Sequence, residues 1–106
     1  MPQIIAESGL ITQINVFDVH PGRQEDLIAL LTEAARSCRD HVPGWVSASL
    51  HLSLDQARVV NYAQTKDEAA MRRVFAHLSG DGWLERNRTF GVAHPGLYRV
   101  VQTVER

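Results

Sequence analysis

The pattern of hydrophobic and polar positions changes its period along the chain, and each change predicts an element. From Thr12 to Val19 most residues are β-branched or aromatic, which is typical of a strand. From Arg23 to Asp40 apolar residues recur at helical spacing, which predicts a helix with one apolar face. That face carries Leu27, Leu30, Leu31, Ala34, Ala35 and Cys38.

A hairpin and a second helix are predicted next. Residues 45–53 alternate between apolar and polar, and residues 58–64 are rich in β-branched types, so the two runs read as paired strands. Thr65 and Glu68 have the spacing of a capping box, which predicts the start of a helix. The predicted helix presents Met71, Val74, Phe75 and Leu78 on one face.

The remaining segments complete the predicted fold. Residues 83–90 are expected to form one or two helical turns, residues 97–104 the last strand, and residues 1–10 an N-terminal arm. The order β-α-β-β-α-β predicts a single α+β, ferredoxin-like domain over residues 1–106, with a four-stranded antiparallel sheet and two helices on one face. Because the other face of such a sheet is uncovered, we expect a homodimer packed face to face.

Composition narrows the class of protein. The chain has 106 residues, is 44% hydrophobic and carries a net charge of -1, which favours one folded domain over a disordered chain. Eleven basic against twelve acidic residues argue against a partner that is a nucleic acid or an anionic membrane. The single cysteine excludes an internal disulfide bond. With neither a signal peptide nor a membrane-length apolar run, we expect a soluble, cytoplasmic protein.

Common catalytic motifs are missing from the sequence. It has no glycine-rich phosphate loop, no G-x-S-x-G elbow and no H-E-x-x-H pair, so neither a nucleotide site nor a metal site is predicted. Cys38 lies on the apolar helix face, where a thiol is usually inert. His20, His41 and His77 border predicted turns and are expected at the surface.

Two polar residues inside the predicted strands are candidates for chemistry. His51 either faces a pocket as an acid or base, or belongs to the outward row of serines around it. Asn61 either binds a substrate oxygen in a cavity or bridges to the backbone, because a buried amide must find partners. An aromatic and basic patch is formed by Trp83, Arg86, Arg88 and Phe90. It either holds a planar ligand, or the Trp packs the helix end and the arginines are solvated.

Several stretches resemble the antibiotic biosynthesis monooxygenase family. The most specific are VPGWVSASLH at residues 42–51 and VVNYAQ at residues 59–64, and the resemblance covers about residues 11–104. It implies a dimeric α+β barrel with one ligand cavity per subunit. It also implies oxidation of anthrones or related phenols by molecular oxygen without flavin, haem or metal. In that comparison Asn61 matches the cavity asparagine and His51 a cavity-adjacent histidine.

The chain departs from the family pattern at three aromatic positions. Thr65 stands where oxidising members often carry Trp, Ala69-Ala70 replaces an aromatic on the next helix, and Leu50 replaces a Tyr. Haem-degrading relatives pair an Asn and a His with that same Trp. Asn15 and His77 could take the first two roles, but the Trp is again missing at Thr65.

The leading hypothesis is therefore a monooxygenase, without a cofactor, that acts on an aromatic polyketide-like phenol. Asn61 and His51 are predicted as catalytic residues, with substrate contacts from Trp83, Arg86, Asn15 and Phe75. Two alternatives stay open: a non-catalytic dimeric module for ligand binding or assembly, and a polyketide cyclase or isomerase on the same fold.

Overall fold

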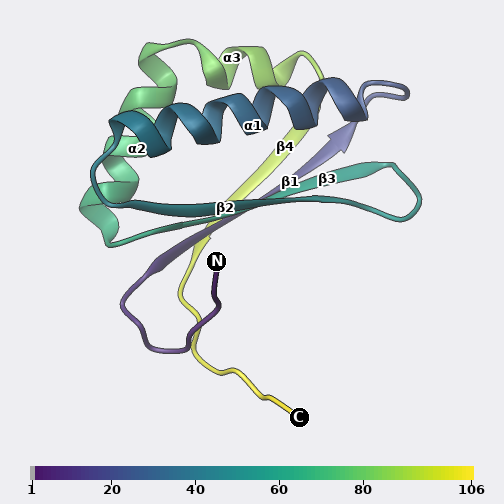
Figure 1. Cartoon of the computed structure of the whole chain (residues 1–106). Coiled ribbons are helices and arrows are strands. Elements are labelled where there is room, and N and C mark those ends of the chain that lie inside the picture. Colours follow the sequence, from purple (N-terminus) through teal and green to yellow (C-terminus); the bar gives the residue numbers. More distant parts are fainter. Residues whose placement is uncertain (1) are drawn as a thin grey trace.

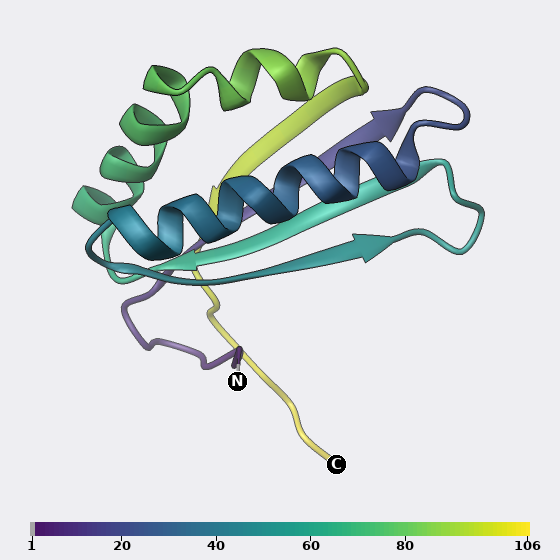
Figure 2. The ribbon, with the colours of Figure 1, turned by 45° about the horizontal axis from the view of Figure 1, so that its top comes forward.

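The fold is a four-stranded antiparallel sheet with its helices on one face (Figures 1 and 2). The computed structural model describes residues 2–106. The α+β ferredoxin-like arrangement predicted from the sequence is confirmed, and the strands lie in the order β2-β3-β1-β4. The elements are β1 (Ile11–Val19), α1 (Gln24–His41), β2 (Trp45–Leu52), β3 (Arg58–Thr65), α2 (Glu68–Gly80), α3 (Trp83–Arg88) and β4 (Gly91–Tyr98).

Two apolar clusters hold the helices against the sheet. One contains Phe17 and Val59 of the sheet with Leu27 and Leu31 of α1. The other lies at the opposite end of β1, where Ile11 packs with residues of α1 and α2. Because side chains alternate along a strand, Gln13 and Asn15 share the inner face with these two β1 residues and lie between the clusters. The inner face is therefore polar at its centre.

The second helix begins two residues later than the capping box predicted. Asp67 is the N-cap, and its carboxylate accepts a hydrogen bond from the backbone N–H of Ala70 at 2.8 Å. The hydroxyl of Thr65 instead donates to the backbone carbonyl of Asp67 at 3.2 Å. Thr65 is still paired with Ile11 and Trp45 in the sheet, and the backbone N–H of Lys66 donates to the Gly44 carbonyl at 2.8 Å, so the helix begins only after these residues.

The predicted position of the last strand, residues 97–104, was wrong. β4 covers Gly91–Tyr98 and contains His94-Pro95-Gly96, which the sequence suggested was a turn. Proline lacks the N–H of a ladder hydrogen bond, but an edge strand tolerates it because only one of its sides pairs. β4 is such an edge, with Pro95 opposite Asn15 of β1.

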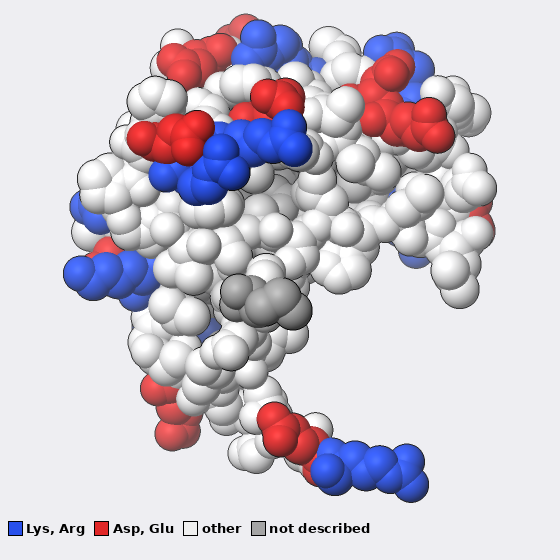
Figure 3. Space-filling view, in the orientation of Figure 1, with Lys and Arg blue, Asp and Glu red and all other residues white. Residues whose placement is uncertain are grey.

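The outer face of the sheet carries few charges. Ile14 and Val16 of β1 lie opposite Tyr62 and Val60 of β3 on this face, and all four are half-buried. Charged side chains gather over the helices, while the hollow below the sheet is largely uncharged (Figure 3). The N-terminal arm and the C-terminal tail lie on the side of the sheet away from the helices (Figure 1).

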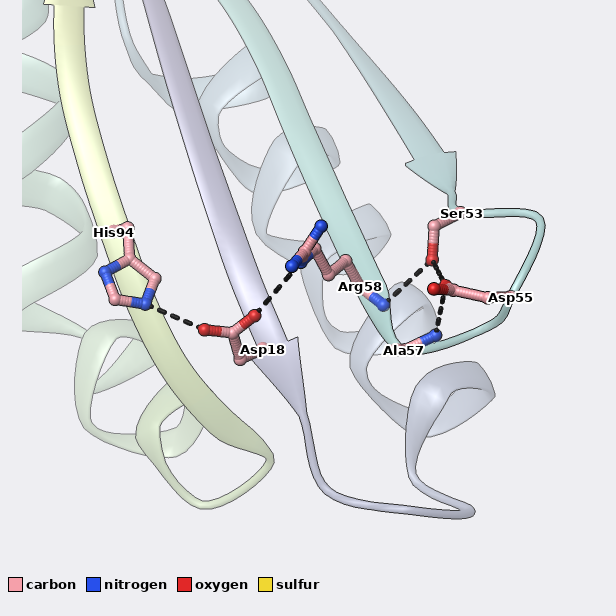
Figure 4. Close-up of polar contacts among 6 residues, drawn as sticks. All are labelled: Asp18, Ser53, Asp55, Ala57, Arg58 and His94. Atoms are coloured by element: carbon pink, nitrogen blue, oxygen red, sulfur yellow. Dashed lines mark hydrogen bonds and ion pairs between the residues drawn. The ribbon is translucent and has the colours of Figure 1, made fainter.

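One polar cluster crosses the outer face near the end of β1. Asp18 accepts hydrogen bonds from His94 at 2.9 Å and from Arg58 at 3.3 Å (Figure 4). The hydrogen bond from His94 makes the largest contribution to lowering the pKa of the Asp18 carboxyl, and the hydrogen bond from Arg58 lowers it further. All three side chains are more than half exposed, so the cluster adds little to stability. Within residues 2–106, no helix is long and apolar enough to cross a membrane.

The close packing of the turn before β2 against α2 leads to a testable prediction about stability. Gly44 has φ +88, and a Cβ there would lie 2.7 Å from that of Ala70, whereas a Cβ at Gly22, with φ +79, meets nothing within 4 Å. Gly22→Ala should cost about 1–2 kcal/mol of unfolding free energy, the penalty of a left-handed backbone alone. Gly44→Ala should cost about 1–3 kcal/mol more, because helix α2 must shift. Urea unfolding of both variants measures the difference, and equal costs would contradict this packing.

Candidate active site

A small cavity occupies the polar centre between the sheet and the helices. Its volume is about 50 Å³, and all three helices and three of the strands contribute to its wall. The sheet contributes Gln13, Asn15 and Asn61, and the helices contribute apolar side chains and one further amide, Asn87. A volume of this size holds only one or two water molecules.

Asn15 and Asn61 lie directly opposite each other on neighbouring strands. The β1–β3 register pairs the two residues, so both side chains point to the helix-covered face with their Cβ atoms about 5 Å apart. The Oδ1 atom of each is buried and has no hydrogen-bond partner among residues 2–106. Both were predicted as site residues from the sequence, and the structure brings them together in this cavity.

Two further residues line the cavity that were not among the site residues predicted from the sequence, Asn87 of α3 and Trp45 of β2. Asn87 on α3 is 8% exposed, and its Oδ1 is also buried without a partner. Trp45, at the start of β2, lines the cavity and is paired across the sheet with Thr65. A bulge between Trp45 and Ser47 turns the indole to the helix-covered face. The cavity therefore has an indole wall although Thr65 itself is not aromatic.

Cys38 is the one titratable side chain among the described residues that line the cavity. It is 2% exposed, as its place on the apolar face of α1 predicted. Burial raises the pKa of its thiol to about 11, so the thiol is neutral at physiological pH. A proton taken from a ligand here has no ready acceptor on the cavity wall.

The structure does not bring His51 to Asn61. Leu50 is paired with Asn61, so His51, the next residue on β2, lies on the outer face of the sheet. There it is exposed and borders a shallow hollow with Ser49, Tyr62 and residues of the N-terminal arm. A catalytic pairing of His51 with Asn61 in this cavity is excluded by that register.

Trp83 and Arg86 also lie outside the cavity lining. The Arg86 guanidinium stacks on the Trp83 ring at 4.2 Å, and it also donates to the backbone carbonyl of Asp81 at 3.3 Å. Because neither residue lines the cavity, a contact of Trp83 or Arg86 with the substrate stays a prediction. His77, expected at the surface, is only 19% exposed because its imidazole is hydrogen-bonded to the Ser37 hydroxyl at 2.8 Å.

Phe75 separates the cavity from a larger groove. The ring lines the cavity on one side and, on the other, a surface groove of about 310 Å³ between α2 and β4. Apolar side chains, including Met71 and Leu97, line this groove together with Arg72 and Arg99. Of the sequence-predicted site residues, Asn15, Asn61 and Phe75 thus meet at one place.

Comparisons with known proteins agree with this architecture. The family profile described as antibiotic biosynthesis monooxygenase matches residues 10–85. Tetracenomycin-F1 monooxygenase of Streptomyces glaucescens is 42% identical over 76 residues, which make up 72% of this chain and 68% of the relative.

Solved structures show the same fold. SnoaB, a cofactor-independent oxygenase from Streptomyces nogalater, superposes with a TM-score of 0.79 at 24% identity, over 92% of this chain and 99% of that chain. A monooxygenase from the gene ActVA-Orf6 of Streptomyces coelicolor, in complex with the ligand nanaomycin D, has a TM-score of 0.76 at 27% identity over 91% of each chain. With a profile that spans most of the sequence and a relative of 42% identity, the chain belongs to the antibiotic biosynthesis monooxygenase family.

Proposed function

We propose that this protein is a cofactor-independent monooxygenase that oxidises an aromatic polyketide-like phenol or anthrone to a quinone with molecular oxygen. The observation that carries the proposal is the pair of partnerless carboxamide oxygens of Asn15 and Asn61 in one cavity. A buried amide without a partner costs about 1–3 kcal/mol, and a substrate hydroxyl would remove that cost. The named activities of the 42% identical relative and of the ActVA-Orf6 protein support the same class of substrate.

The proposed oxidation needs little from the protein beyond a buried cavity with amide groups in its wall. Because the cavity wall offers no base, the ring C–H proton passes to water or hydroxide, which leaves the substrate as a delocalised anion. The anion transfers an electron to O₂, and the two radicals combine and take up a proton to give a hydroperoxide. Loss of water then leaves a carbonyl, so the ring CH₂ gains one oxygen atom and the other leaves as water with the two hydrogens. The Asn61 amide group would donate a hydrogen bond to the oxyanion that forms in the first step. Its Oδ1 would accept one from a neighbouring hydroxyl.

Substrate entry requires the cavity to enlarge. Pockets for molecules of this class measure about 300–1,000 Å³, whereas the cavity holds about 50 Å³. Rotation of the Phe75 ring would join the cavity to the groove of about 310 Å³ on its other side. In this proposal the groove is the entry path and Trp45 is a wall against which the aromatic rings pack.

We also propose that the protein is a homodimer that packs through the outer face of the sheet. The half-buried row of Ile14, Val16, Val60 and Tyr62, together with the uncharged hollow around it, supports this.

The first prediction from the proposed function compares the catalytic effects of Asn61 and His51. With an anthrone in an oxygen electrode, and with neither metal nor flavin added, Asn61→Ala should lower kcat by about 100-fold, the usual effect of losing an oxyanion donor. His51→Ala should stay within about twofold of the original protein, because His51 lies on the other face of the sheet. Quinone formation is followed by mass spectrometry. Tight binding without oxygen uptake by the unmodified protein would instead support the ligand-binding module.

The second prediction concerns pH. Because the pKa of Cys38 is raised to about 11, the thiol should not affect the rate between about pH 6 and 9. The rate should rise with pH as the substrate ionises, and the profiles of Cys38→Ala and the original protein should superimpose. A shoulder near pH 8.5 that disappears in Cys38→Ala would show a thiolate base and contradict this account.

The third prediction tests the dimer. Val60→Asp places a carboxylate at the centre of the outer face, where packing against a second copy would remove it from water, so the variant should sediment as a monomer. Ala29→Asp, on the exposed side of α1, is the matched control and should sediment as the original protein does. A monomeric original protein in sedimentation velocity, or a dimeric Val60→Asp variant, would overturn the proposed interface.

A further inference from the structure

Asn87 is buried within a helix whose other polar residues face solvent. In the six-residue helix α3, Glu85, Arg86 and Arg88 are exposed, whereas Asn87 is 8% exposed. Gly82, in the left-handed conformation with φ +76, starts the helix and sets its direction over the sheet. Leu84 and Asn87, three residues apart and thus on the same side of α3, both line the cavity.

The Asn87 side chain has no structural partner that explains its burial. Its Oδ1 has no hydrogen bond within residues 2–106, although the same helix provides capping bonds through its backbone. A structural asparagine at a helix end would normally bond to nearby backbone groups. A buried amide oxygen without such a bond can accept a hydrogen bond from a group that enters the cavity, such as water or a ligand hydroxyl.

Asn87 faces the cavity from the side opposite Asn15 and Asn61. The two strand residues belong to the floor formed by the sheet, and Asn87 belongs to the roof formed by the helices. Between floor and roof the wall is largely apolar, with Leu31, Val74 and Phe75 among its members. A ligand that satisfies all three amides must therefore carry hydrogen-bonding groups on two separate edges of an apolar body.

We propose that Asn87 is a specificity-determining residue that binds an outer-ring hydroxyl of the substrate, on the edge away from the oxyanion held by Asn61. This inference rests on the proposed function and narrows its substrate class to fused-ring phenols with hydroxyl groups on two edges. Because Asn87 acts on a ring that does not react, its contact is equally present in the ground state and the transition state. It therefore contributes to KM and not to kcat.

The test compares two substrates that differ by one outer-ring hydroxyl, emodin anthrone and chrysophanol anthrone. The original protein should show a KM about 3- to 10-fold lower for emodin anthrone, the effect of one neutral hydrogen bond. Asn87→Leu, which is similar in size but cannot form that bond, should remove this preference and leave kcat unchanged. Asn87→Ala is a second variant, and Arg88→Ala, exposed on the same helix, is the matched control that keeps the preference.

A binding measurement keeps this inference separate from the proposed function. The quinones emodin and chrysophanol should quench tryptophan fluorescence through Trp45, and emodin should bind more tightly only while Asn87 is present. If neither anthrone is oxidised but the emodin preference depends on Asn87, the proposed reaction fails and the specificity role holds. If Asn87→Leu keeps the preference, or weakens both ligands equally, the specificity role is overturned whether or not turnover occurs.

Discussion

The structure depends on a polar region placed where a small domain would normally put its core. Along the inner face of β1, Ile11 and Phe17 belong to two separate apolar clusters, with Gln13 and Asn15 between them. Asn61 of β3 extends this region sideways and Asn87 covers it from α3. Buried amide oxygens without partners cost stability, so this polar region is where the proposed ligand would gain the most from hydrogen bonds.

The core is divided into two apolar clusters, one on each side of the cavity, and these clusters fix the helices to the sheet. The cluster around Phe17 and Leu27 fixes α1 to the sheet, and the cluster around Ile11 and Met71 fixes α2. The cavity lies between them, bordered on one side by Phe75, which is only half-buried. Phe75 also packs against the cluster around Ile11 and Met71, so movement of that ring would open the site at this cluster and leave the one around Phe17 and Leu27 in place. Chemistry that relies on an anionic substrate then needs hydrogen bonds and exclusion of water more than an ionisable side chain.

Much of the fold could be predicted from the sequence because the apolar period is strong in α1, α2 and β2, and because β-branched residues mark β1 and β3. The errors arose where a local sequence pattern, such as a turn signal, was overridden by the pairing of strands in the sheet. Pro95 indicated a turn, yet an edge strand accommodates it beside Asn15. His51 and Asn61 were both recognised as unusual strand residues, but only the register shows that they occupy opposite faces. A shift of one residue in that register would have reversed the conclusion.

Asn87 and Trp45 were missed for a different reason. α3 is too short to show a helical period, and the charged neighbours of Asn87 conceal its burial. Trp45 was recognised only as part of a family motif, since the bulge that turns it inward leaves no sequence signal.

A crystal structure with bound emodin would show whether an aromatic ligand enters the cavity. We expect ligand oxygens within about 3.2 Å of the amide groups of Asn61 and Asn87, with the Phe75 ring displaced toward the groove. Emodin bound only in the outer groove or on the other face of the sheet, with the cavity closed, would contradict this expectation.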